Sequence, residues 1–354
     1  MTTVALAAGG TGGHVLPALS VAEALEGRAD LVFLGGDRFE ATAVPAAGLD
    51  LVQAPVQGLQ RSLTPRNLAI PLSVWRAAGI FGDAMTARGV GALLATGGYV
   101  AVPAGIAARR LGLPIFLHEQ NAHAGLANRF MGRWAKATFT SFPETEGAIR
   151  PRYVGNPIRA AIATLDRAAL RPAALERYGL ARGRVTVGIV GGSLGARSIN
   201  EAMLDAAPLL GDAQVLHLTG PRFADEVRPR TAGLGVPWSV VGFEDEMEWF
   251  FAAVDLVVSR ASGMVAELTA TGTPSVLIPG SFGSKGHQAA SAAHLAAAGA
   301  AVVVGEENLD RLGSEVARLV GDPNARAAMS DAARAIGRPN AATVIAEEVL
   351  RAAG

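Results

Sequence analysis

Two glycine-rich loops carry the residues best suited to chemistry. The first, Ala8–His14, reads AGGTGGH, and the second, Gly191–Asn200, reads GGSLGARSIN. Each follows an apolar run of strand length and precedes a helix-length segment, and the free amides at a helix start bind negatively charged groups. The loops therefore indicate phosphate or sugar sites. The first loop does not fit the dinucleotide-binding pattern GxGxxG, because Val15 stands where the third glycine would be.

His14, at the end of the first loop, is a candidate general base. An imidazole with the ordinary pKa of about 6.5 is mostly neutral at pH 7, so it can accept the proton of an attacking hydroxyl. The dipole of the following helix disfavours its protonation further. A histidine that only caps the helix is the alternative. Tyr99, in another strand-glycine-helix junction, is a polar side chain but too weak a base unless its pKa is perturbed.

Polar residues follow further predicted strands in both halves of the chain. Ser193 can donate a hydrogen bond to a phosphate, and Arg197 follows one turn later, where it is either a ligand or a solvated helix charge. Glu267 falls in the early turns of a helix, where a carboxylate can accept both hydroxyls of a ribose or simply favour the helix dipole. Gln288 follows a glycine-rich loop, and His118–Arg129 gathers polar groups just past a strand.

The composition excludes several classes of protein. The 354 residues suggest about two domains, and half of them are hydrophobic, which suffices for buried cores. Lys plus Arg and Asp plus Glu both number 31, so the formal net charge is zero and a nucleic-acid partner is not expected. The absence of cysteine excludes disulfides and thiolate zinc sites. No metal motif or P-loop is present, and the longest charge-free stretch, Gly89–Ala108, is interrupted by glycines and Pro103, so no transmembrane segment is predicted.

The elements that must position these residues alternate between strand-length and helix-length segments, as in a doubly wound parallel sheet. In the first half, strands are predicted at 3–8, 31–34, 92–95, 115–118 and 138–141, and helices at 16–26, 68–88 and 103–111. The pattern restarts with strands at 185–190, 214–219, 239–241, 256–259, 275–278 and 301–304. The sequence therefore predicts an α/β chain of two Rossmann-like domains, joined near Gly155-Asn156-Pro157 and followed by a helix at 340–353.

Six sequence blocks, in this order, resemble the MurG family of UDP-N-acetylglucosamine:lipid I N-acetylglucosaminyltransferases. They are GGTGGHVLPAL, TGGYVAVP, HEQNAHAGLANR, YVGNPIR, GGSLGAR and SRASGMVAEL with GHQ, and they span residues 9–288. The resemblance implies the GT-B glycosyltransferase fold, with two Rossmann-like domains facing across a cleft. An acceptor-binding and membrane-facing domain is expected at 1–157, a UDP-GlcNAc-binding domain at 158–338, and a C-terminal helix at 339–354 that packs back on the first domain.

The same resemblance implies a reaction. N-acetylglucosamine (GlcNAc) would pass from UDP-GlcNAc to O4 of the N-acetylmuramic acid (MurNAc) in lipid I, with inversion and without a metal ion or cofactor. The products would be lipid II and UDP, in peptidoglycan synthesis.

The resemblance also assigns residues to each substrate. Phe243 would cap the uracil and Glu267 would hold the ribose. The donor-binding residues would be Thr11, Gly12, Gly13, Asn121, Arg159, Ser193, Phe243, Glu244, Ser262, Gly263, Met264, Val265, Ala266, Glu267 and Gln288. The acceptor-binding residues would be Tyr99, His118 and Gln120. His14 would be the general base, and Glu119 is the alternative base or an acceptor contact.

The chain departs from the commoner family pattern near the nucleotide site. Leu194 replaces a glutamine, Ser291 replaces an asparagine, and the loop at 259–267 is one residue shorter than in many members. Two other functions stay open: a UDP-sugar epimerase of the same architecture, and a non-catalytic nucleotide-sugar binder that keeps only the donor half. The intact HEQN and TGGYV blocks argue against the binder. A nicotinamide oxidoreductase fits the fold but not the glycine pattern.

A lipid-linked acceptor predicts a membrane-docking surface. The segment 61–88 combines apolar residues and a tryptophan with arginines, which is typical of a helix lying in an anionic headgroup layer. The expected contacts are Leu68, Leu72, Trp75, Phe81, Arg66 and Arg76. A core helix with arginines on its wet side is the alternative. The expected location is peripheral, on the cytoplasmic face of the inner membrane, with other cell-wall synthesis proteins as further partners.

Overall fold

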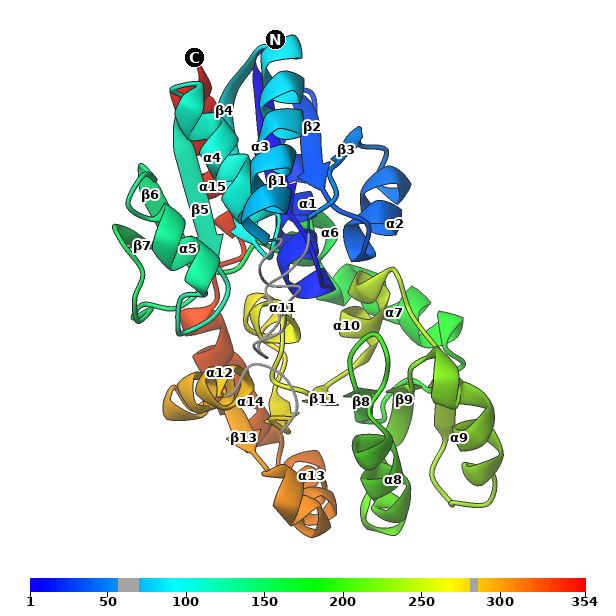
Figure 1. The fold of residues 1–354 in the computed structure, drawn as a ribbon. Helices are drawn as coiled ribbons and strands as arrows, with labels where there is room; N and C mark the ends of the chain where they lie inside the picture. Colours follow the sequence, from blue (N-terminus) through cyan, green and yellow to red (C-terminus); the bar gives the residue numbers. More distant parts are fainter. Residues whose placement is uncertain (57–69, 281–285) are drawn as a thin grey trace. The chain divides into compact units, whose positions relative to one another are not determined.

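Parallel β-sheets form the centre of both halves of the chain (Figure 1). The structure, a computed structural model, describes residues 1–56, 70–280 and 286–354. These residues divide into unit 1, Met1–Ala160 with Pro339–Gly354, and unit 2, Ala161–Arg338. The prediction of an α/β chain with two Rossmann-like domains is confirmed.

Unit 1 contains a seven-stranded sheet in the order β3-β2-β1-β4-β5-β6-β7. Its strands are β1 (Thr3–Ala8), β2 (Asp30–Gly35), β3 (Leu51–Gln53), β4 (Val90–Gly97), β5 (Ile115–Glu119), β6 (Ala137–Thr140) and β7 (Pro151–Tyr153). Its helices are α1 (Gly12–Leu25), α2 (Phe39–Ala46), α3 (Ile70–Ala87), α4 (Ala101–Arg110), α5 (Leu126–Met131) and α15 (Ala341–Ala353). All neighbouring strands pair in parallel, and the order reverses between β1 and β4. Ligands of open α/β sheets bind at the carboxyl ends of strands beside such a reversal.

The two faces of the first sheet are covered by different helices. Buried side chains of α3, α4 and α5 fill one face, and those of α1 and α15 fill the other. Figure 1 shows α15, in red, beside the strands of unit 1, although the whole of unit 2 separates it from them in sequence. Ile345, Ala346 and Val349 of this helix are fully buried in the core of unit 1.

Helix α3 is amphipathic, and its orientation corrects one expectation. Phe81 is fully buried with Met85 in the core between α3 and the sheet, so its predicted contact with a membrane is wrong. The outer face instead exposes Leu72 (51%), Trp75 (62%) and Ile80 (38%). Two further residues of the predicted surface, Arg66 and Leu68, lie outside the described residues. None of the helices in the described ranges is long and apolar enough to cross a bilayer.

Unit 2 repeats the arrangement with six parallel strands in the order β10-β9-β8-β11-β12-β13. The strands are β8 (Thr186–Val190), β9 (Gln214–Leu218), β10 (Trp238–Val241), β11 (Leu256–Ser259), β12 (Ser275–Leu277) and β13 (Ala301–Val303). The helices are α6 (Ala160–Ala163), which begins at the boundary, α7 (Arg167–Arg177), α8 (Arg197–Asp205), α9 (Ala224–Arg230), α10 (Met247–Ala253), α11 (Met264–Thr271), α12 (His287–Ala297), α13 (Leu312–Gly321) and α14 (Pro323–Ile336). Short 3₁₀ turns are η2 (Ala207–Leu209), η3 (Pro221–Phe223) and η4 (Glu306–Arg311). The strand order reverses between β8 and β11, which places the second glycine loop beside the reversal.

Candidate active site

The predicted site residues of unit 1 gather at the carboxyl edge of its sheet. Strands β2, β1, β4 and β5 are consecutive neighbours and run in parallel, so the loops that follow them lie side by side. These loops carry the first glycine loop, Gly36, Tyr99 and the HEQN segment. The edge therefore brings together side chains that are far apart in sequence.

His14 lies in the first turn of α1, because that helix begins at Gly12 rather than at the predicted Leu16. Its ring packs closely on Gly97, where an added Cβ atom would lie only 2.6 Å from His14 Cδ2. The backbone oxygen of His14 accepts a 2.8 Å hydrogen bond from Thr96 Oγ1. The loop before α1 and the end of β4 thus hold the imidazole between them.

Burial keeps the His14 ring neutral although two carboxylates lie near it. Burial lowers its pKa below the ordinary value of 6.5, and this effect outweighs the carboxylates of Glu119 and Glu40, which raise it. The Nδ1 atom is buried and has no hydrogen-bond partner among the residues that the structure describes. At pH 7 the imidazole is therefore unprotonated and can accept a proton.

Glu119, the alternative base, is already engaged by four donors at the end of β5. Its Oε1 accepts hydrogen bonds from the backbone nitrogen (3.0 Å) and the side-chain Nδ2 (2.9 Å) of Asn121. Its Oε2 accepts from Gly125 N (2.9 Å) and Asn128 Nδ2 (2.8 Å). The side chain is 2% exposed, and a proton bound to it would displace one of these donors. The geometry suits a carboxylate that holds the HEQN loop in shape.

His118 and Gln120 also turn into the protein. His118 is completely buried; its Nε2 lies 3.1 Å from the Gly155 carbonyl oxygen and its Nδ1 lies 3.0 Å from Gln120 Nε2. Gln120 Nε2 donates to Thr96 O as well, at 2.7 Å. Burial lowers the pKa of His118 to about 4. The expectation that His118 contacts an acceptor is therefore wrong: its side chain cannot reach a ligand, and it ties β5 to the chain at Gly155.

Tyr99, a predicted acceptor contact, points its hydroxyl at a protein carboxylate. The hydroxyl donates a 2.5 Å hydrogen bond to Glu40 Oε1, and the guanidinium of Arg38 lies 5.0 Å from the ring centre. Burial, followed by the contact with Glu40, raises the pKa of the Tyr99 phenol above its ordinary value. The phenol thus stays protonated and is excluded as a base.

The other unit 1 residues assigned to the donor are more open. Thr11 and Gly13 are exposed at the start of α1, and Gly12 is half-buried. Asn121 is half-buried in the HEQN loop, and Arg159 is half-buried near the end of the unit.

The second glycine loop, after β8, presents an exposed serine. Gly195 adopts φ +76°, and a Cβ atom there would lie 2.1 Å from the Thr219 carbonyl oxygen, so only glycine fits this turn. The turn leaves Ser193 exposed and Leu194 69% exposed. Arg197, whose role the sequence left open, forms a two-point ion pair with Glu226 at 2.6 and 2.9 Å.

Helix α11 carries the predicted ribose site. Ser262 and Gly263 are exposed just before the helix, and Glu267 is half-buried in its first turn. Met264 and Ala266 are half-buried, whereas Val265 is 8% exposed and packs inward. Val265 can therefore meet a ligand only through its backbone.

The loop after β10 carries an exposed aromatic ring on a firmly held backbone. Phe243 is 50% exposed, whereas the Glu244 carboxylate turns inward. Glu244 accepts hydrogen bonds from Tyr178 Oη (2.6 Å), from Arg177 Nη2 (3.1 Å) and from the nitrogen of Glu246 (3.0 Å). The side chain of Glu244 thus anchors the loop that presents Phe243.

Gln288 and Ser291 lie in the first turns of α12. Gln288 Oε1 accepts a 2.8 Å hydrogen bond from Gly280 N, just past β12. Ser291 Oγ donates to the His287 carbonyl within the helix at 2.9 Å. The serine that replaces the commoner asparagine therefore points back to its own helix.

Three polar residues of these edges received no role from the sequence, although two of them, Asn128 and Arg260, lie within the blocks that resemble the family. Glu40 is fully buried and Asn128 is 4% exposed. Arg260, after β11, donates a 3.2 Å hydrogen bond to Ser198 Oγ and forms an ion pair with Glu306. A lone charged residue in the otherwise uncharged segment 39–46 was the available signal for Glu40.

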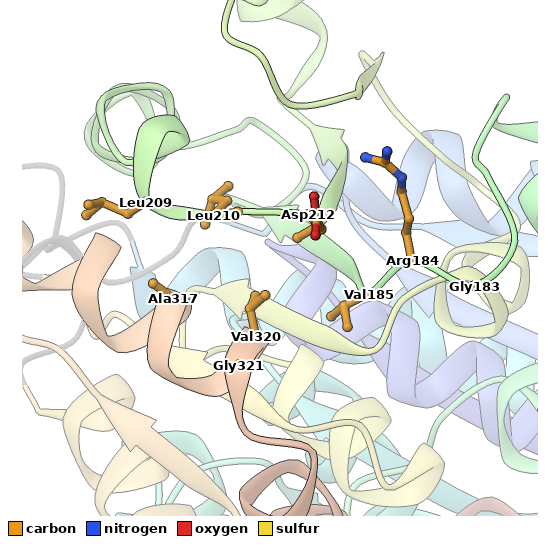
Figure 2. A pocket seen from close by; sticks show the side chains of 11 residues that line it. Gly183, Arg184, Val185, Leu209, Leu210, Asp212, Ala317, Val320 and Gly321 are labelled. Carbon is orange, nitrogen blue, oxygen red and sulfur yellow. The ribbon is translucent and has the colours of Figure 1, made fainter.

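A cavity of about 390 Å³ in unit 2 lies at the opposite edge of the second sheet (Figure 2). It is lined by the segments that precede β8 and β9 and by the end of α13, including Val185, Asp212 and Val320. None of the predicted site residues within the described ranges lines it. The cavity is separate from the candidate site because it lies at the amino ends of the strands.

Both units match known glycosyltransferase domains. Residues 4–140 match the glycosyltransferase family 28 N-terminal domain, and residues 186–348 match the family 28 C-terminal domain. Among solved structures, the crystal structure of Acinetobacter baumannii MurG superposes with a TM-score of 0.81 at 28% identity and covers 99% of this chain and 100% of that one. A UDP-GlcNAc 2-epimerase from Neisseria meningitidis gives a TM-score of 0.71 at 13% identity over 99% of this chain and 100% of that one, which shows a shared fold alone.

Relatives in sequence share one name. The UDP-N-acetylglucosamine–N-acetylmuramyl-(pentapeptide) pyrophosphoryl-undecaprenol N-acetylglucosamine transferase of Halorhodospira halophila is 41% identical over 90% of this chain and 89% of its own length. The protein of the same name from Acidothermus cellulolyticus is 41% identical over 86% of this chain and 85% of its own. Because two family 28 domains match, and because relatives at about 41% identity and a MurG structure cover most of its length, the chain belongs to the MurG family of glycosyltransferases.

Proposed function

We propose that this chain transfers N-acetylglucosamine from UDP-GlcNAc to O4 of the N-acetylmuramic acid in lipid I, forming lipid II and UDP. The bond from the anomeric carbon to O4 forms as the bond to the UDP oxygen breaks, with inversion at that carbon, and the hydroxyl proton needs an acceptor. Relatives named for this activity along most of the chain support the reaction. The placement of the His14 imidazole, in the first turn of α1 at the carboxyl edge of unit 1 and packed on Gly97, is the observation that carries the mechanism.

His14 is the proposed general base. It takes the proton from the acceptor hydroxyl as O4 attacks, because an alcohol is a poor nucleophile at neutral pH. The two competing groups are less suitable: the Glu119 carboxylate is saturated with four donors, and the Tyr99 phenol has a raised pKa. A helix start favours the neutral form of His14, which is the form a base must have.

The nucleotide of the donor is assigned to unit 2. The exposed Ser193 can donate to a phosphate, the exposed ring of Phe243 can stack on the uracil, and Glu267 can accept the ribose hydroxyls. Gln288 lies at the same carboxyl edge, after β12. The resemblance to the family implies further donor contacts. In unit 2 they are Glu244, Ser262, Gly263, Met264, Val265 and Ala266, and in unit 1 they are Thr11, Gly12, Gly13, Asn121 and Arg159.

Incubation with UDP-GlcNAc, with and without a lipid I analogue, tests the reaction. The transferase releases UDP only when the acceptor is present and yields a disaccharide product. Isomerisation of the sugar without acceptor would instead identify an epimerase, and binding without turnover would identify a nucleotide-sugar binder.

Turnover is proposed to need no metal ion, as the family resemblance implies. The rate after exhaustive treatment with EDTA measures this requirement. An unchanged rate is expected, and a loss of activity that Mg²⁺ or Mn²⁺ restores would refute the proposal.

The outer face of α3 is the proposed membrane-docking surface, on the cytoplasmic side of the membrane. Leu72, Trp75 and Ile80 are exposed there, and Arg76 is exposed next to the tryptophan. Exposed apolar side chains with an interfacial tryptophan and a cation suit a headgroup layer that contains anionic lipid. The lipid-linked acceptor in the proposed reaction requires the enzyme to work at such a surface.

A further inference from the structure

Glu40 is a buried carboxylate enclosed by three loops of the candidate site. It lies in α2, after β2, and is 0% exposed. Its Oε2 accepts a 2.9 Å hydrogen bond from Gly10 N, and its Oε1 accepts from Gly36 N at 3.0 Å and from the Tyr99 hydroxyl at 2.5 Å. Glutamates are almost never fully buried unless they are paired, and here three donors from three loops satisfy the charge.

The backbone around this carboxylate is packed so tightly that it admits no side chains. A Cβ atom at Gly9 would lie 2.9 Å from Glu40 Oε1, and one at Gly36 would lie 2.1 Å from the Tyr99 hydroxyl oxygen. A Cβ atom at Gly98 would lie 2.0 Å from the Gly9 carbonyl oxygen. The turns after β1, β2 and β4 thus meet around Glu40, and glycine is the only residue that fits between them.

The hydrogen bonds of Glu40 fix the two chain segments that flank His14. On one side, Glu40 binds Gly10 in the loop that leads into α1, four residues before His14. On the other side, it binds Tyr99, two residues after Gly97, on which the imidazole packs. Gly10 has a φ of +105°, and a glycine backbone can adopt many other conformations at little steric cost. An acceptor fixed in the core therefore decides where that amide points.

We propose that Glu40 is a positioning residue for glycosyl transfer. By binding both Gly10 and Tyr99, it fixes the first glycine loop and the loop after β4 around His14. The inference rests on the proposed role of His14. Glu40 itself touches no substrate in this scheme. It acts through the backbone of the first glycine loop and through the end of β4, where Gly97 contacts the imidazole.

Glu40→Gln tests the proposal, because it keeps the shape and removes one strong acceptor and the charge. We expect a kcat at least tenfold lower, a KM for UDP-GlcNAc within twofold of the wild type, and faster amide hydrogen exchange in the peptide that covers residues 9–16, measured without substrates. Tyr99→Phe removes one of the three donors and should give a smaller effect of the same kind. It also serves if Glu40→Gln fails to fold.

The pH profile tests whether the charge of Glu40 acts on the His14 ring, as the proposed arrangement around His14 requires. The charges that act on His14 are Glu40 and Glu119, both of which raise its pKa, and the neighbouring His118 is neutral. Removing the Glu40 charge should therefore move the acid limb of kcat/KM to lower pH. Glu23→Gln is the matched control, because Glu23 also accepts a backbone hydrogen bond in unit 1, from Ala160 N at 2.9 Å, away from the loop. Glu23→Gln should leave kcat, the amide hydrogen exchange of residues 9–16 and the acid limb of kcat/KM unchanged.

Two outcomes separate this inference from the proposed base. Unchanged exchange of the loop peptide in both Glu40→Gln and Tyr99→Phe would overturn the positioning role, whatever the rates are. Faster exchange in both, together with a near-normal kcat for His14→Ala, would support the positioning of the loop and reject His14 as the base.

Discussion

Replacing His14 by alanine should separate the two candidate bases when it is compared with Glu119→Ala. General-base catalysis contributes about 10²–10⁴-fold, which corresponds to about 2.7–5.4 kcal/mol at about 1.36 kcal/mol per tenfold. The wild-type pKa of His14 lies below 6.5, so at pH 7.5 more than about nine-tenths of the enzyme holds the neutral ring. The full loss of kcat should therefore appear at that pH, with little change in the KM for UDP-GlcNAc.

The two variants should differ in stability as well as in rate. His14→Ala removes no hydrogen bond at Nδ1, because that atom has no partner among the described residues. The free energy of unfolding should therefore fall by only about 1 kcal/mol. Glu119→Ala leaves four hydrogen-bond donors without their acceptor. The side-chain amide of Asn128 is buried, whereas Gly125 is exposed and its backbone nitrogen can bind water. At about 1.5–3 kcal/mol for a hydrogen bond to a charged group, we expect a loss of about 3 kcal/mol.

Steady-state kinetics with a soluble lipid I analogue and thermal unfolding measure both effects. About 3 kcal/mol corresponds to a fall in Tm of about 6–12 °C for a unit of this size. The acid limb of kcat/KM should lie below pH 6.5 in the wild type and disappear in His14→Ala. The reasoning is refuted if His14→Ala keeps near-normal kcat, while Glu119→Ala loses activity with an unchanged Tm.

Three further predictions follow from the same geometry. Glu267→Ala should raise the KM for UDP-GlcNAc about tenfold or more, because hydrogen bonds to a charged group contribute about 1.5–3 kcal/mol. Trp75→Glu should weaken binding to vesicles that contain anionic lipid, without changing turnover of a soluble acceptor analogue. The buried His118, with a pKa of about 4 against 6.5 in the unfolded chain, should make stability fall as the pH drops from 6.5 towards 4. The loss at pH 5 is about 2 kcal/mol, measurable by urea unfolding.

Each of these predictions has its own control. An unchanged KM in Glu267→Ala would remove the ribose assignment. Leu209→Glu is the matched control for Trp75→Glu, because Leu209 is 56% exposed in unit 2, and equal vesicle binding by both variants would contradict docking through α3. For the pH effect, the unfolded state binds the additional proton between pH 6.5 and 4, so a His118→Gln variant should show a smaller pH slope. An equal slope would place the effect elsewhere.

The sequence predicted the central strands well, because continuous apolar runs bounded by glycine leave little choice. The observed bounds of β1 (Thr3–Ala8) and β11 (Leu256–Ser259) equal the predicted ones. Strands β3 (Leu51–Gln53) and β7 (Pro151–Tyr153) were missed, because three partly exposed residues at a sheet edge form no distinct pattern.

The sequence predicted where the site residues lie in the fold, but not the direction in which their side chains point. The sequence placed Tyr99 and Glu244 after strands at the carboxyl edges, where they are found. Whether such a side chain faces a ligand or the protein depends on partners far away in sequence. Tyr99 turns to Glu40, 59 residues earlier, and Glu244 turns to Tyr178, 66 residues earlier. Local pattern contains no information about either pair.

The return of α15 to unit 1 has a consequence for how the chain is made on the ribosome. Ile345, Ala346 and Val349 belong to the core of unit 1, so residues 1–160 cannot complete their core until the last helix has been synthesised. At about 5–20 residues per second, this delay is about 10–40 s. Unit 2 (Ala161–Arg338), whose residues are contiguous, can be complete before the unit that precedes it. Until then, the apolar face of the nascent first half that binds α15 stays uncovered, and exposed apolar surface of this kind is prone to aggregation during synthesis.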